Sequence, residues 1–172
     1  MKGKQIIVSV IVAVATLAAS LCAFWSRGYD FINDQNRANS LEEAQLFRDI
    51  LIEGNYTVPS EFDQFVQKYG KEYGVRIFIL DQDGIVLAES NGEETGKDYS
   101  TACAEVQKAL GGEESATLEQ AFTWAVNNSY AAAIVKTEAF RGIVYTQRPL
   151  YTLAELNGEL MKQIMLGVLL CV

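Results

Sequence analysis

The feature that most constrains this chain is an uninterrupted apolar run of 20 residues near its N-terminus, Ile6 to Trp25. The run carries no charge and is interrupted only by two serines and a threonine. As an α-helix it would be about 30 Å long, which matches the hydrocarbon thickness of a bilayer. We therefore predict a transmembrane helix over residues 6–25. Lys2 and Lys4 would keep the short N-terminus, residues 1–5, in the cytoplasm.

A cleaved leader is the alternative interpretation of this run. A secretory signal has an apolar core of about 7–15 residues and then small residues at the cleavage site, whereas this run is longer and no good site follows it. A lipoprotein signal is also disfavoured, because the bulky Leu21 directly precedes Cys22. An uncleaved anchor is the favoured interpretation, and a secreted or surface-anchored binding protein is the weaker one.

The C-terminal end carries a second apolar run, residues 164–172, within which the sequence ends. Nine residues are about half of what a membrane-crossing helix needs. We expect residues 151–172 to form an exit helix and an incomplete second transmembrane helix that continues past Val172 into a cytoplasmic effector. A short hydrophobic tail packed on the folded domain is the alternative. Two spans around a folded segment, with an effector after the second, are typical of a receptor.

Charge and composition exclude several classes of function for the segment between the runs. Residues 26–160 hold 22 acidic and 11 basic side chains, a net charge of −11 that repels nucleic acid and anionic lipid. The chain has no histidine, which removes the commonest general base and zinc ligand. Cys103 is the one cysteine in this segment, and we predict a buried, unreactive residue that forms no disulfide within the domain. No catalytic residue, metal site or cofactor is expected in this chain.

Residues 26–54 contain no proline and are compatible with a helix throughout. The first half is polar and the second half is amphipathic, as expected of a stalk that leaves the membrane and then docks on a domain. We predict a stalk helix over residues 26–54 and an extracytoplasmic sensor domain over residues 55–150.

Within that domain, a helix is predicted from about Ser60, with Ser60 and Asp63 as a capping pair and Gly74 as its end. A shorter helix is expected over residues 100–110. Period-2 apolar patterns and turn residues predict the strands, which are residues 75–80, 85–89, 115–118 or 122–126, 130–136 and 142–147. This order predicts an α+β fold in which helices on one side cover a five-stranded antiparallel sheet.

Two segments carry a resemblance to a known family. They are YGVRIFILDQDGIVLAES, residues 73–90, and IVKTEAFRGIVYTQRPL, residues 134–150, which leads into the second apolar run. Together with the order of elements, they resemble the extracytoplasmic PAS-like (PDC-like) sensor domain of membrane-bound histidine kinases, the phosphate-regulon sensor kinase in particular. The resemblance implies a long helix packed on a five-stranded sheet and a last strand that leads into the second span.

The function that this resemblance implies is detection of an extracytoplasmic signal and its relay to a cytoplasmic protein-histidine kinase of a two-component system. The receptor would lie in a bacterial cytoplasmic membrane, contact membrane lipid, act as a homodimer and phosphorylate a response regulator. ATP and magnesium would bind only in the kinase domain beyond Val172. The alternatives are the sensor of a chemoreceptor or membrane diguanylate cyclase, and a domain that docks an envelope protein. The sequence selects no ligand, effector or response regulator.

Two sets of charged residues are candidates for binding. The basic residues expected on or near the sheet are Arg76, Lys136, Arg141 and Arg148, which either hold an anion in a pocket or lie on the solvent face of half-buried strands. The acidic residues that crowd two loops are Glu89, Glu93, Glu94, Asp98, Glu113 and Glu114, which form either a patch for cations or a solvated rim. The aromatic residues expected in the core rather than in a ligand cage are Phe78, Phe122, Trp124, Tyr130, Phe140 and Tyr145.

The run Asp81-Gln82-Asp83-Gly84 has the composition of a calcium loop but lacks its spacing. Counting Asp81 as the first position, the twelfth would have to be a bidentate glutamate, and it is Gly92. Aspartate and glycine also suit a tight turn between strands. We therefore predict that Asp81, Asp83 and Gly84 form the turn of a hairpin.

Overall fold

The computed structural model describes residues 2–122 and 125–150, without the side chains of residues 2–8, 10, 11, 13, 25, 120–122 and 125–127. The described residues form two compact units, one up to Gln35 and the other from Asn36 onward. Within the described residues, we find no helix with both the length and the apolar character that a membrane crossing requires. The predicted second span, 151–172, lies outside the described residues, as do several side chains of the predicted first span.

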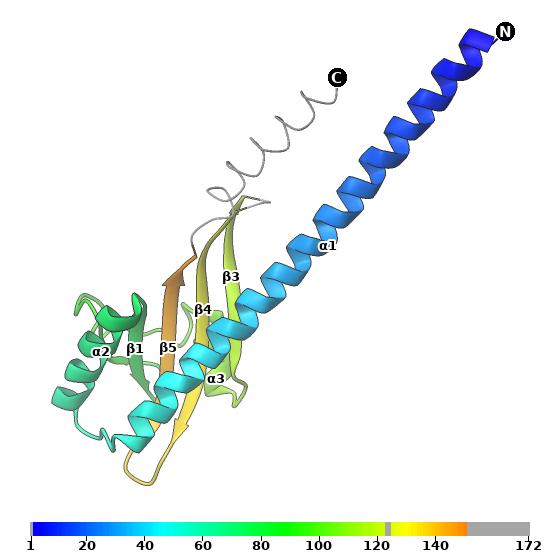
Figure 1. Cartoon of the computed structure of the whole chain (residues 1–172). Coiled ribbons are helices and arrows are strands. Elements are labelled where there is room, and N and C mark those ends of the chain that lie inside the picture. Colours follow the sequence, from blue (N-terminus) through cyan, green and yellow to red (C-terminus); the bar gives the residue numbers. More distant parts are fainter. Residues whose placement is uncertain (1, 123–124, 151–172) are drawn as a thin grey trace. The chain divides into compact units, whose positions relative to one another are not determined.

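One five-stranded sheet organises the second unit (Figure 1). All its neighbouring strands are antiparallel, and the order across it is β2-β1-β5-β4-β3. The strands are β1 (Arg76–Asp81), β2 (Val86–Glu89), β3 (Ser115–Phe122), β4 (Ala125–Lys136) and β5 (Arg141–Pro149). The predicted α+β class and five-stranded antiparallel sheet are confirmed, and the last strand in sequence is the central strand of the sheet.

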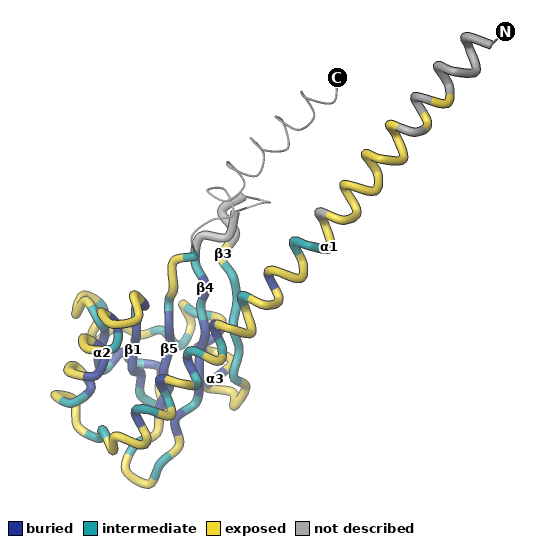
Figure 2. Tube along the Cα trace, viewed as in Figure 1, coloured by how far each residue is buried: buried dark blue, intermediate teal, exposed yellow. Residues whose placement is uncertain are grey.

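The described part of the chain also contains three helices: α1 (Lys2–Glu53), α2 (Pro59–Tyr73) and α3 (Ala104–Leu110). On one face, Phe47 of α1 and Phe62 of α2 form a core with the inward side chains of β1, β4 and β5. On the other face, Val106 of α3 packs in a second core with Phe78 and Tyr145. Figure 2 shows the buried residues along the strands. The expectation that all helices lie on one side was therefore wrong for α3.

The alternation of side chains along β1 explains the two cores. Ile77 and Ile79 belong to the core under α1 and α2, whereas Phe78 and Leu80 belong to the core under α3. All four are at most 1% exposed. A strand that is buried on both faces is apolar at every position, so its sequence does not reveal which face each helix covers.

Glu61 caps the N-terminus of α2, not the predicted pair Ser60 and Asp63. The carboxylate oxygen Oε2 of Glu61 accepts hydrogen bonds from the backbone N–H groups of Thr57 and Val58, at 2.9 and 3.3 Å. Since the helix begins at Pro59, one residue earlier than expected, Ser60 is already in the first turn. Gly74 ends the helix as predicted, in the left-handed conformation with φ of 65°.

The predicted hairpin between β1 and β2 is confirmed. Oδ1 of Asp81 accepts hydrogen bonds from the backbone N–H groups of Asp83 and Ile85, both at 2.9 Å. Gly84 has a φ of 86°, and a Cβ there would lie 2.9 Å from Cβ of Ser100. These contacts account for Asp81 and Gly84 as turn residues.

Two predicted boundaries were wrong. The short helix begins at Ala104 rather than Ser100, because residues 100–102 form a turn. Just before this turn, the backbone N–H of Tyr99 donates a hydrogen bond of 2.9 Å to the carbonyl of Gly84 in the β1–β2 hairpin. Of the two alternatives for the third strand, residues 115–118 lie within β3, which extends further than expected, to Phe122, and Phe122 pairs with Ala125 of β4.

Candidate functional site

A cavity of about 640 Å³ lies on the α3 face of the sheet. Its wall comes from the loop before α3, the first turn of α3 and strands β3, β4 and β5. The lining residues are Lys97, Asp98, Tyr99, Ala102, Cys103, Ala104, Glu105, Thr117, Leu118, Glu119, Tyr130, Tyr145 and Gln147. A cavity of this size, with aromatic walls and a few polar groups, has the character of a small-molecule site.

Three tyrosines form the aromatic part of this cavity. The rings of Tyr130 and Tyr145 are stacked with centroids 6.2 Å apart, and Tyr99 meets Tyr145 edge-on at 6.0 Å. Burial, followed by the charge of Glu94, raises the pKa of Tyr99 to about 12. Burial and the hydrogen bond to Glu119 raise the pKa of Tyr130 to about 12, and burial also raises the pKa of Tyr145. All three are neutral phenols at physiological pH.

Carboxylates form the polar part of the cavity. Glu105, on α3, is only 6% exposed, and the Thr117 hydroxyl donates a hydrogen bond to it. Oε2 of Glu119 accepts the Tyr130 hydroxyl at 2.6 Å. The ammonium of Lys97 lies 2.7 Å from a carboxylate oxygen of Glu94. Half-buried Cys103 lies at the N-terminus of α3, and burial raises the pKa of its thiol, which favours the unreactive form that the sequence predicted.

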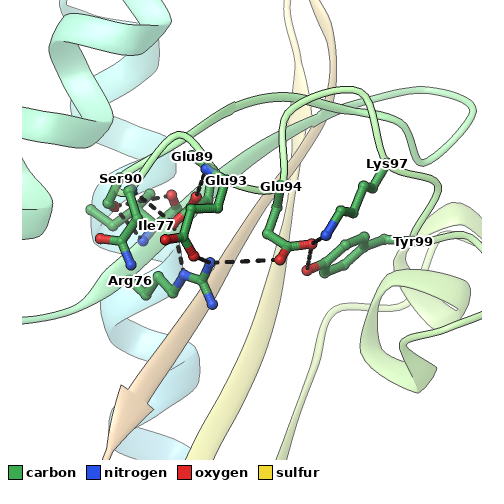
Figure 3. Close-up of polar contacts among 9 residues, drawn as sticks. Arg76, Ile77, Glu89, Ser90, Glu93, Glu94, Lys97 and Tyr99 are labelled. Atoms are coloured by element: carbon green, nitrogen blue, oxygen red, sulfur yellow. Dashed lines mark hydrogen bonds and ion pairs between the residues drawn. The ribbon is translucent and has the colours of Figure 1, made fainter.

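Arg76, one of the four basic candidates, is held by the chain's own carboxylates (Figure 3). Its Nε lies 2.7 Å from Oε1 of Glu89, and its Nη2 lies 3.9 Å from Glu93 and 4.0 Å from Glu94. The Glu89 carboxylate is fully buried and also accepts the backbone N–H groups of Asn91 and Glu93, at 2.8 and 3.0 Å. This cluster joins β1 to the loop after β2.

The other basic candidates lie elsewhere. Arg148 forms an ion pair of 3.0 Å with Glu43 on α1. Lys136 and Arg141 are exposed and face each other across the β4–β5 ladder, where the two strands meet. None of the four lines the 640 Å³ cavity. Arg76 borders a second cavity of about 440 Å³ beside α2, and Lys136 and Arg141 line a third of about 150 Å³. Anion binding by these residues stays a prediction.

The acidic candidates fall into three places rather than one patch. Glu89, Glu93 and Glu94 surround Arg76, and Asp98 lines the cavity. Glu114 accepts hydrogen bonds from Arg48 and Gln45 on α1 and from the Ile134 backbone, at 2.7 to 2.8 Å, while Glu113 is exposed. Within the described residues, we find no cluster of three or more side chains suited to a metal ion.

Acid is expected to destabilise the fold through Glu89 and Glu114. Burial raises the pKa of each carboxyl, but hydrogen bonds and nearby positive charge outweigh it, so that both pKa values lie below the ordinary one. At Glu89 the partners are Arg76 and two backbone amides. At Glu114 they are the Ile134 amide, Gln45 and Arg48. Their stabilisation is therefore complete above about pH 4.3 and is lost as the pH falls through the lower folded-state pKa values. Urea unfolding of the chain between pH 7 and pH 3 measures this slope. The double variant Glu89→Gln/Glu114→Gln should have a flatter slope, and an unchanged slope would contradict the assignment.

Sequence reasoning missed most of the cavity. Tyr130 and Tyr145 were predicted to be core residues. Tyr145 is a core residue, since it is only 3% exposed, but both tyrosines also line the cavity. Phe78 and Phe140 are in or against the core as predicted, while the side chains of Phe122 and Trp124 lie outside the described residues. The sequence signal that could have indicated the cavity is the presence of tyrosine rather than phenylalanine on the strands. A buried phenol hydroxyl needs a polar partner, so such tyrosines favour the edge of a core over its interior.

No protein-family model matches the chain. A comparison with curated proteins finds no match either. One similar solved structure is the sensor domain of the Vibrio cholerae histidine kinase DctB, which is 15% identical, with 77% of this chain and 52% of that one covered and a TM-score of 0.45. Another is the Escherichia coli DcuS sensor domain, which is 14% identical, with 73% of this chain and 98% of that one covered and a TM-score of 0.43. A third is an extracellular ligand binding receptor from Desulfohalobium retbaense, which is 18% identical, with 53% of this chain and 15% of that one covered and a TM-score of 0.40.

The chain spans 15% of the Desulfohalobium receptor and 52% of the DctB sensor domain, and all three TM-scores are below 0.5. Likenesses of this size identify neither a ligand nor an activity. The resemblance to the phosphate-regulon type of kinase stays a prediction from the sequence.

Proposed function

We propose that this chain is the sensory N-terminal region of a transmembrane sensor histidine kinase. Residues 26–160 lie outside the cytoplasmic membrane, and the 640 Å³ cavity detects the signal. The observation that carries this proposal is that the cavity is built on β5, through Tyr145 and Gln147. The predicted second span follows β5 in the sequence, so an occupant of the cavity contacts the strand that leads to the kinase.

The relay depends on differential contacts. A ligand shifts the equilibrium between two receptor states only if it binds one of them more tightly. A ligand held between α3 and β5 favours the state in which those two elements close on it, and β5 moves with that closure. Two copies of the receptor act as a dimer through their stalk helices, and the kinase phosphorylates a response regulator using ATP and magnesium bound beyond Val172.

Filling the cavity tests the proposal without a known ligand. We fuse residues 1–172 to a bacterial sensor kinase from the middle of that kinase's second membrane span onward, so that the joined span is complete, and measure a transcriptional reporter. Ala104 lines the cavity and is exposed, so Ala104→Trp places an indole where a ligand would lie. We expect the basal output to change about fivefold or more, since about 1 kcal/mol in a two-state equilibrium has this effect.

Lys108→Trp is the matched control, because Lys108 is exposed on the same helix but does not line the cavity. Its output should equal that of the parent fusion. Equal outputs from all three fusions, at equal protein levels, would refute a sensing role for the cavity.

The alternative is a non-kinase receptor, such as a chemoreceptor or membrane diguanylate cyclase, with the same sensing cavity. The reading frame past Val172 separates the two. A histidine-bearing dimerisation helix after the second span supports the kinase, whereas a signalling coiled coil or a cyclase domain refutes it and leaves the sensor intact.

A further inference from the structure

The charge of the cavity is unbalanced. Asp98, Glu105 and Glu119 contribute three carboxylates to its wall, and Lys97 contributes the one ammonium among its described lining residues. That ammonium is already 2.7 Å from Glu94, a residue outside the lining. A wall with excess negative charge attracts cations and repels a carboxylate ligand.

Among the carboxylates of the cavity wall, the buried Glu105 is the one that a bound cation would stabilise most. The chain has a matched case for comparison, because Glu89 and Glu105 are its two buried carboxylates among the described residues, at 1% and 6% exposed. Glu89 has the Arg76 guanidinium and two backbone amides as partners. Glu105 has the Thr117 hydroxyl, and no basic side chain pairs with it in the described part of the chain. A buried carboxylate without a cation is unfavourable, so a ligand that supplies the positive charge gains binding energy there.

The tyrosines suit the same ligand. The face of a phenol ring carries negative charge density, and ammonium groups bind over such faces. Tyr99, Tyr130 and Tyr145 line the cavity together, with centroids about 6 Å apart. Their hydroxyl groups stay protonated at neutral pH, so the tyrosines present neutral ring faces to a ligand.

We propose that the cavity binds a small organic ammonium ion, with its charged group between the Glu105 carboxylate and the tyrosine rings. This proposal rests on the proposed function, in that it names the ligand class of the sensing cavity. A volume of about 640 Å³ admits a molecule of metabolite size. A primary ammonium would donate hydrogen bonds to the carboxylate, and a quaternary one would contact mainly the rings.

Calorimetric titration of the purified chain in a maltoside detergent tests the proposal, because maltosides carry no ammonium group. The probes are tetramethylammonium, 1,4-diaminobutane and, as an anion of similar size, succinate. We expect at least one of the two cations to bind and succinate not to bind. Glu105→Gln should weaken cation binding about tenfold or more, since it removes the charge but keeps the shape.

Glu113→Gln is the control, because Glu113 is exposed and does not line the cavity. It removes the same charge and should leave the affinity within about twofold. At the cavity wall, Tyr130→Leu should weaken binding more than Tyr130→Phe, because only leucine removes the ring face. This pair remains informative if Glu105→Gln lowers the melting temperature.

The outcomes separate this proposal from the proposed function. Binding of succinate but of neither cation, or equal cation affinity in the wild type, Glu105→Gln and Tyr130→Leu, overturns the ammonium proposal and leaves the sensing cavity in place. Cation binding that depends on Glu105, in a fusion whose reporter responds neither to the cation nor to Ala104→Trp, supports the ligand class and overturns the sensing role.

Discussion

Replacing Arg76 by methionine is expected to lower the free energy of unfolding by about 3 kcal/mol at pH 7. The substitution keeps an apolar side chain of similar length on β1 but leaves the buried Glu89 carboxylate with two backbone amides and no cation. Removing one partner of a buried ion pair is costly because the remaining charge stays out of water. Reversible urea unfolding of the chain, followed by circular dichroism, measures the loss.

Arg141→Met provides the control, because Arg141 is exposed on β5 and this substitution makes the same change in charge and shape. It should change the stability by no more than about 0.5 kcal/mol. The destabilisation by Arg76→Met should also shrink as the pH falls, because a protonated Glu89 carboxyl carries no charge for Arg76 to neutralise. Equal stability of the two variants at pH 7 would show that the ion pair contributes nothing.

Phe62→Ala should lower the free energy of unfolding by about 4 kcal/mol. Phe62 is 1% exposed in the core between α2 and the sheet, and its ring centroid lies 4.8 Å from that of Phe140, which directly precedes β5. The substitution leaves a cavity in a core that the sheet cannot collapse to fill. Leu46→Ala, at a residue of α1 that is 45% exposed, should cost less than about 1 kcal/mol in the same assay. Similar losses from both variants would mean that α2 is not packed as described.

Local patterns predicted the elements of this fold well. The hairpin between β1 and β2 was predictable because Asp81 and Gly84 satisfy a tight turn by themselves. The distribution of helices over the two faces was not predictable, because β1 is apolar at consecutive positions from Ile77 to Leu80. The start of α2 was missed because the capping carboxylate, Glu61, lies inside the helix and binds backward to Thr57.

The candidate cavity was harder to predict for a different reason. Its wall combines five segments between residues 97 and 147, and the residue that matters most to our proposal, Glu105, resembles an ordinary exposed glutamate of a short helix in the sequence. Its burial follows from the packing of α3 on the sheet. The basic candidates were chosen for their charge, and the charges that neutralise Arg76 and Arg148 come from residues 13 and 105 positions away.

The central position of β5 has a mechanical consequence. The strand is bonded along its length on both sides, to β1 from Arg76↔Gln147 to Asp81↔Gly142 and to β4 from Asn128↔Pro149 to Lys136↔Arg141. Because antiparallel hydrogen bonds run perpendicular to the strands, a force along β5 loads both ladders in shear, with all the bonds sharing the load at once. An edge strand under the same force would peel away one bond at a time. A pull or push at Pro149 therefore displaces the sheet as a stiff plate, and little of that displacement is lost to stretching within it.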